Sequence, residues 1–171
     1  MSALLSGCAF SGIGGYGRRS PAGAGLQGQG SRQAPALSGN GTWLASLMER
    51  NGRLSLILQQ QPDGRMVPLR RIQGHEPHSS PSLSWNGRYL AALVQQGNQR
   101  LAVIEDRLSG RLHPLRLPGN PMAVKLTLAP DAQRLAIELI RDGRRQVQMF
   151  DLSNMLEPDK PAGSRISGAP R

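Results

Sequence analysis

The segment LSGNGTWLA at residues 37–45 decides the fold, because it returns twice, as LSWNGRYLA at residues 83–91 and as LAPDAQRLA at residues 128–136. The three copies begin 46 and then 45 residues apart. The match continues downstream, where Pro68-Leu69-Arg70 comes back 46 residues later as Pro114-Leu115-Arg116. A fixed period of this length predicts a repeat fold, in which each repeat is one supersecondary unit that packs on its neighbours.

Apolar alternation and turn signals inside each repeat predict β-strands. In the second repeat Leu101 and Val103 alternate with Ala102 and Ile104, which is the period of a strand. Each repeat has a dipeptide that accepts the positive φ of a tight hairpin, namely Asn51-Gly52, Gly97-Asn98 or Asp142-Gly143. The first two repeats also have a second turn, at Pro62-Asp63-Gly64 and Leu108-Ser109-Gly110. Each repeat is therefore predicted to hold about four antiparallel strands, which make one β-propeller blade.

The repeated segments resemble the TolB-like propeller repeat, whose motif is Ser-Pro-Asp-Gly followed by a short basic step and Leu-Ala. No copy keeps all four motif residues, but the three copies are in register. The resemblance implies that the turn residues build the blades and do not react; they are Ser38, Asn40, Gly41, Ser84, Asn86, Gly87, Pro130 and Asp131. Because the third copy has Ala132 where the others have glycine, its turn is expected to be distorted.

The expected architecture is all-β, a partial propeller of three antiparallel four-stranded blades at about residues 35–80, 81–122 and 123–156. The last blade is expected to be incomplete, because no Pro-Leu-Arg follows Leu152. Residues 1–34 are rich in glycine and serine, and residues 157–171 are rich in proline and glycine. Such segments bury too little apolar surface to offset the entropy of ordering, so both tails are expected to be disordered.

Leu5-Ser6-Gly7-Cys8 resembles the bacterial lipobox. The resemblance implies a peptidase cut before Cys8, a diacylglycerol on its thiol, and lipid anchoring in the bacterial periplasm. Ala9, where inner-membrane lipoproteins have aspartate, favours the outer membrane. Only residues 1–4 stand before the box, so a signal segment of the usual length would need a start further upstream. The alternative is an inert cysteine in a flexible tail.

The charge balance indicates anionic partners. Lysine and arginine together number 21 against 11 acidic residues, a net charge of +10. An anionic membrane surface or an acidic protein fits this charge. Nucleic acid is not expected, because single-strand binders stack bases on aromatic rings. Here Trp43, Trp85 and Tyr89 belong to the repeat motif and are expected to pack between blades.

No motif predicts catalysis, a cofactor or a metal. Residues 12–17 fit G-x-G-x-x-G, but they neither follow a predicted strand nor open a helix. His75-Glu76-Pro77-His78 offers two imidazoles and a carboxylate, but metal sites need three or four converging ligands, so a solvated loop is expected. The single cysteine excludes an internal disulfide framework.

The expected function is therefore binding or scaffolding, through a protein partner in the cell envelope. Propellers usually close with about four to eight blades. Two chains could complete a ring as a homodimer, or another protein could supply the missing blades. Two alternatives stay open. One is a soluble basic interaction module that binds nucleic acid or an acidic protein. The other is a non-catalytic relative of a propeller-bearing hydrolase, since TolB-like repeats also precede peptidase domains.

Overall fold

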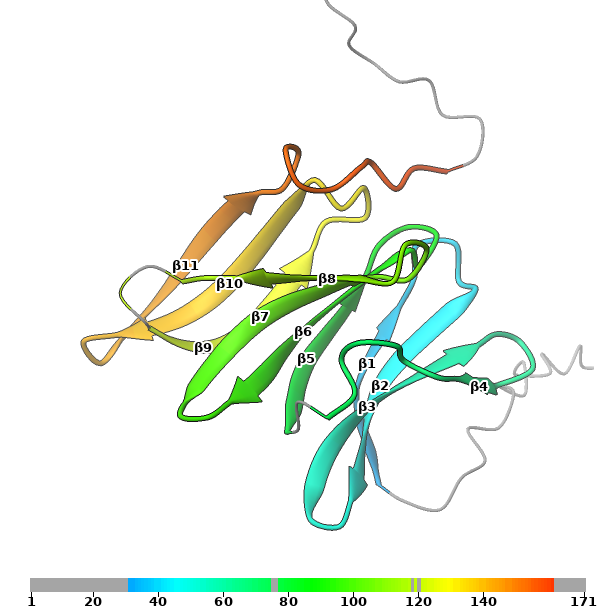
Figure 1. Cartoon of the computed structure of the whole chain (residues 1–171), viewed down its shortest axis with the longest axis horizontal. Coiled ribbons are helices and arrows are strands. Elements are labelled where there is room, and N and C mark those ends of the chain that lie inside the picture. Colours follow the sequence, from blue (N-terminus) through cyan, green and yellow to red (C-terminus); the bar gives the residue numbers. More distant parts are fainter. Residues whose placement is uncertain (1–30, 75–76, 118, 120, 162–171) are drawn as a thin grey trace, which may run out of the picture.

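The computed structural model describes residues 31–74, 77–117, 119 and 121–161. The secondary structure of these residues consists of β-strands joined by turns, in three antiparallel sheets (Figure 1). The all-β prediction is confirmed, and each sheet corresponds to one sequence repeat.

The sheets are called blades A, B and C. Blade A has the strand order β1 (Arg32–Leu37), β2 (Trp43–Arg50), β3 (Arg53–Gln60) and β4 (Arg65–Val67). Blade B repeats this order with β5 (His78–Leu83), β6 (Tyr89–Gln96), β7 (Gln99–Asp106) and β8 (Arg111–Leu115). Blade C has three strands, β9 (Met122–Leu128), β10 (Arg134–Arg141) and β11 (Arg144–Asp151). Among the described residues blade C has no fourth strand, as the sequence predicts.

The predicted limits of the folded part are too narrow at both ends. Strand β1 begins at Arg32, and it pairs there with Met48, so the boundary at residue 34 falls inside a strand. On the other side, the segment 157–161 was expected to be disordered, yet its Asp159 is buried. Composition alone misses both, because the ordering comes from hydrogen bonds to residues far away in the chain.

The core lies in two layers between the three blades. β6 shows how the alternation of a strand serves two neighbours. One face packs on blade A through Leu90, Ala92 and Val94. The other face packs on blade C through Tyr89, Ala91 and Leu93. Blade B is therefore covered on both faces.

The chain reversals gather at two opposite ends of the blades (Figure 1). We call one the motif end: it holds the repeat turns at residues 38–42, 84–88 and 129–133, which join the first two strands of each blade. We call the other the hairpin end: it holds the tight hairpins β2–β3, β6–β7 and β10–β11. The first strand of each blade lies on the inside, and β5 contacts both β1 and β9.

Candidate interaction site

The serine and asparagine of the repeat motif hold the turns at the motif end. In blade A the Ser38 Oγ accepts a 2.9 Å hydrogen bond from the Trp43 amide, and the Asn40 Oδ1 accepts one of 3.0 Å from Thr42. In blade B the Ser84 Oγ accepts the equivalent bond from the Tyr89 amide at 2.9 Å. A short side chain that bonds its own backbone is what such turns favour.

The three turns are also bonded to one another. The Asn40 amide donates to the Trp85 carbonyl at 3.0 Å, and the Trp85 amide donates to the Pro130 carbonyl at 2.6 Å. The Trp85 ring lies against Gly39, and the Trp43 ring lies against Gly87, so closely that a Cβ at either glycine would be 2.4 Å from a ring carbon. The motif residues thus lock neighbouring blades together, which is a structural role.

The third turn keeps the geometry of the others. Ala132 has φ of +61°, close to the +72° of Gly41 and the +68° of Gly87. The expected distortion is wrong: alanine adopts the left-handed conformation here because Asp131 still bonds the Gln133 amide at 3.0 Å and Ala132 is fully buried.

The aromatic residues of the motif are occupied by the fold. The Arg107 guanidinium lies 3.9 Å from the centroid of the Trp43 ring, and burial lowers the pKa of Arg107. Tyr89 is 1% exposed. These rings pack between blades, as predicted from the sequence, and offer no stacked platform for bases.

The segment that follows blade C crosses back to blade B at the motif end. The Asp159 carboxylate accepts bonds of 2.8 Å from the amide and from the side-chain Nδ2 of Asn86, and it also accepts the Ser84 hydroxyl. The Asp159 amide donates to the Asp131 carbonyl at 2.9 Å. Residues 152–160 therefore form a strap, the name used below, over blades B and C.

An arginine of blade B forms ion pairs with both blade B and the strap. Arg88 donates two hydrogen bonds to the Asp106 carboxylate, at 3.1 and 3.2 Å, and it also pairs with Glu157 of the strap. Burial by itself would raise the pKa of Asp106. The hydrogen bonds from Arg88 and Ser109, with the backbone amides of Leu108 and Ser109, outweigh burial and lower this pKa to about 2.

Two buried polar residues clamp blade A to blade B. The Glu105 carboxylate accepts the amides of Arg70, Arg71 and Ile72 at 3.0–3.1 Å. The His78 Nδ1 accepts the Leu56 amide at 2.9 Å, and its Nε2 lies 3.0 Å from the Ile72 carbonyl.

The solvated loop expected around His78 is wrong, because this imidazole is 2% exposed at the start of β5. Residues 75 and 76 lie outside the described part. Sequence reasoning missed both clamps; the available signal was Glu105, an acid directly after the apolar residues 101–104 of β7.

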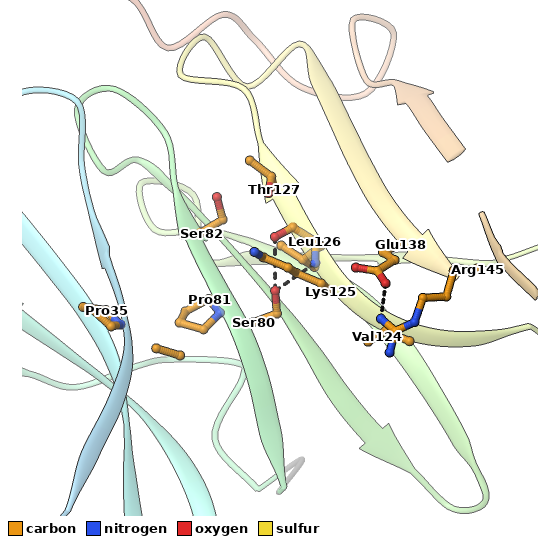
Figure 2. A pocket seen from close by; sticks show the side chains of 11 residues that line it. Pro35, Ser80, Pro81, Ser82, Val124, Lys125, Leu126, Thr127, Glu138 and Arg145 are labelled. Carbon is orange, nitrogen blue, oxygen red and sulfur yellow. Dashed lines mark hydrogen bonds and ion pairs between the residues drawn. The ribbon is translucent and has the colours of Figure 1, made fainter. Parts of the chain in front are cut away.

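A hollow of about 640 Å³ lies along the inner strands. Figure 2 shows Ser80 directed at the Leu126 backbone, with bonds of 2.8 and 3.1 Å, and Glu138 paired with Arg145. The Ser82 Oγ accepts the Leu128 amide at 2.9 Å. These hydroxyls join β5 to β9, and within the described residues no cluster of three histidine, cysteine or acidic side chains could hold a metal.

One blade face is left uncovered. Blade A packs on blade B through four positions, Ala45, Leu47, Leu56 and Leu58. The equivalent positions of the second repeat pack blade B on blade C, and they are Ala91, Leu93, Ala102 and Ile104. The equivalents in blade C are Ala136, Glu138, Val147 and Met149, which lie opposite one another in β10 and β11. Val147 is 71% exposed and Met149 is 64% exposed. We call this surface the open face.

No family model matches the chain, and no curated protein matches it significantly in sequence. Solved structures match its fold. TolB from Acinetobacter baumannii is 16% identical with a TM-score of 0.59, and the match covers 76% of this chain and 32% of that one. A protein described as a TolB from Agrobacterium tumefaciens is 11% identical with a TM-score of 0.63, covering 74% and 48%. The tricorn protease is 11% identical with a TM-score of 0.53, covering 74% and 14%.

The fold is that of part of a β-propeller. The chain spans less than half the length of each of these three structures. The predicted TolB-like fold, with antiparallel blades, is confirmed at the level of architecture, while identities this low show nothing beyond the fold.

The lipobox residues Leu5, Ser6, Gly7 and Cys8, and the glycine motif at residues 12–17, lie outside the described residues. In the part of the chain that the structure does describe, no helix is long and apolar enough to cross a membrane.

Proposed function

We propose that this chain is a non-catalytic protein-interaction module of the bacterial cell envelope, located in the periplasm and held to a membrane, most simply the outer membrane, by a lipid on Cys8. The fold shared with TolB proteins and the lipobox-like Leu5-Ser6-Gly7-Cys8 support the proposal. The absence of catalysis is part of it: the Ser80 and Ser82 hydroxyls in the hollow are engaged with backbone groups of β9.

The open face of blade C carries the proposal. The repeat positions that form this face are the ones that make the contacts of blade A with blade B and of blade B with blade C. The open face therefore has the geometry to pack against another sheet. Its apolar members Val147 and Met149 lie side by side with the charged pair Glu138 and Arg145. An apolar centre beside charges of both signs is self-complementary under a two-fold axis. We therefore assign the face to a second copy of this chain.

Ring closure between blade C of one copy and blade A of the other is a poorer arrangement. The outward face of blade A, turned away from blade B, has Ser46, Ile57 and Gln59 at its centre. These three side chains are already 2–4% exposed, so a partner would gain little from covering them. The homodimer that we propose joins open face to open face.

Light scattering at tens of micromolar tests the interface. The wild-type chain should be a dimer, and Val147→Glu with Met149→Glu should be a monomer. Leu108→Glu is the matched control, because Leu108 is 74% exposed at the motif end and lies outside the open face. A wild-type monomer, or equal loss of dimer in the control, would refute the assignment.

Fatty-acid labelling tests the anchor. Expressed from its natural start in a bacterium, the wild-type protein should take up label and sediment with membranes. Cys8→Ser should do neither. If both forms are unlabelled and soluble, the lipid anchor is wrong, whatever the light scattering shows.

A further inference from the structure

The hairpin end of the three blades is strongly basic. Strand register places seven arginines there against two carboxylates. The arginines are Arg32, Arg50, Arg53, Arg100, Arg116, Arg141 and Arg144, and the acids are Glu49 and Asp142. All of these arginines are exposed except Arg32 and Arg100, which are half-buried. The Glu138–Arg145 pair belongs to the open face instead.

The motif end has nearly balanced charges. Eight cations face seven acids in the described residues of that end. The cations are Arg65, Arg70, Arg71, Arg88, Arg107, Arg111, Arg134 and Lys160, and the acids are Asp63, Glu105, Asp106, Asp131, Asp151, Glu157 and Asp159. Arg88 pairs with Asp106 and Glu157, so the fields of these three groups cancel at short range. The excess positive charge of the folded part is thus directed to one end.

The N-terminal segment joins the fold at the basic end. Strand β1 begins with Arg32 opposite Met48, close to the β2–β3 hairpin (Figure 1). Residues 1–31 contain Arg18 and Arg19 and no acidic residue. If Cys8 is lipidated, as the proposed function has it, this attachment holds the basic end toward the membrane.

We infer that the hairpin end docks on an anionic lipid surface, with its arginines on the headgroup phosphates. Basic residues next to anionic headgroups gain from the surface potential, and the gain falls with salt. Met122, at the start of β9 on the same end, is 54% exposed and adds an apolar side chain among the cations. Docking leaves the open face and the motif end accessible to protein partners.

Lipid fits this end better than nucleic acid does. Single-strand binders stack bases on aromatic rings between the cations. Among the described residues Trp43, Trp85 and Tyr89 all lie at the motif end, packed between blades. The described part of the hairpin end presents arginines without tryptophan, tyrosine or phenylalanine side chains, which suits a plane of phosphates.

The test uses the full chain with Cys8→Ser, so that no lipid anchor contributes. Binding is measured by cosedimentation with phosphatidylcholine vesicles that contain phosphatidylglycerol. The test variant has Arg50, Arg53 and Arg144 changed to Gln. The matched control has Arg65, Arg111 and Arg134 changed to Gln, which removes the same charge from exposed sites at the motif end. Circular dichroism confirms that both are folded.

The wild-type chain should bind in low salt, release steeply as salt rises, and ignore pure phosphatidylcholine. The hairpin-end variant should lose roughly 100-fold in partition coefficient, and the control less than about 5-fold. Equal losses would show an effect of net charge alone and overturn the inference, as would absent vesicle binding. Arginine-dependent binding to single-stranded DNA without vesicle binding would assign the end to nucleic acid instead. Because the protein carries no lipid anchor, each of these outcomes is independent of the labelling test. Every variant keeps Val147 and Met149, so differences between the variants do not reflect the proposed dimer interface.

Discussion

Gly87 is the position at which one methyl group tests the contact between blades A and B. The change is Gly87→Ala, and its matched control is Gly41→Ala, the same repeat position one blade earlier. Both glycines have positive φ, +68° and +72°. A Cβ at Gly41 would have nothing within 4 Å, whereas a Cβ at Gly87 would lie 2.4 Å from Cδ1 and 2.8 Å from Cγ of Trp43.

The two costs can be estimated separately. An L-residue in the left-handed region costs about 1 kcal/mol, and this applies to both variants. Gly87→Ala adds an overpacking cost of about 1–3 kcal/mol, because Trp43 cannot move freely under the Arg107 guanidinium at 3.9 Å. We expect Gly41→Ala to lose about 1 kcal/mol of unfolding free energy and Gly87→Ala about 2–4 kcal/mol.

Urea denaturation followed by circular dichroism measures both losses. Adding Trp43→Ala should recover part of the loss in Gly87→Ala and none in Gly41→Ala, and a double-mutant cycle gives the coupling. If the two alanine variants were equally stable, or if the cycle showed no coupling, the tryptophan contact would not hold the blades together.

Three further changes address the clamps and the strap. Glu105→Gln replaces the charged acceptor of the backbone amides at residues 70–72. We expect it to lower the free energy of unfolding, measured by urea denaturation, by about 3 kcal/mol. A loss below about 1 kcal/mol would mean that other contacts hold this loop. Folding lowers the pKa of Asp106 from 3.8 to about 2. About 2 kcal/mol of stability, present above pH 4, should therefore be lost as the pH falls toward 2. Asp106→Asn should flatten this part of the plot of stability against pH, and an unaltered plot would contradict the assignment. Asp159→Ala should lower the free energy of unfolding by about 2 kcal/mol and speed hydrogen exchange of the Asn86 amide. Glu157→Ala is the control, because its side chain is 78% exposed, and it should change stability by less than about 0.5 kcal/mol. Equal effects of the two variants would show that Asp159 does not hold the strap in place.

The sequence was sufficient for the blades, because strand alternation and turn chemistry are local. The spacing of Leu44, Leu90 and Leu135, the hairpin dipeptides and the missing Pro-Leu-Arg after Leu152 predict the three sheets and the short third one correctly.

Contacts between distant residues could not be predicted in this way. Asp159 bonds residues more than 70 positions earlier, and Glu105 bonds amides more than 30 positions earlier. Neither pairing has a local pattern. The conformation of Ala132 differs from the prediction for the same reason. The turn sequence alone predicts that alanine avoids positive φ, but burial of Ala132 in the core between blades B and C offsets the strain.

The strap and the clamps have a consequence for how the molecule comes apart. Repeat proteins with contacts only between adjacent faces can unfold one unit at a time. Here Glu105 of blade B fastens a loop that belongs to blade A, and the residues after blade C fasten a turn of blade B. Neither outer blade can detach without breaking a polar anchor on the middle one. Amide protons in β6 and β7 should therefore exchange only in the global unfolding event, and the three blades should behave as one cooperative unit.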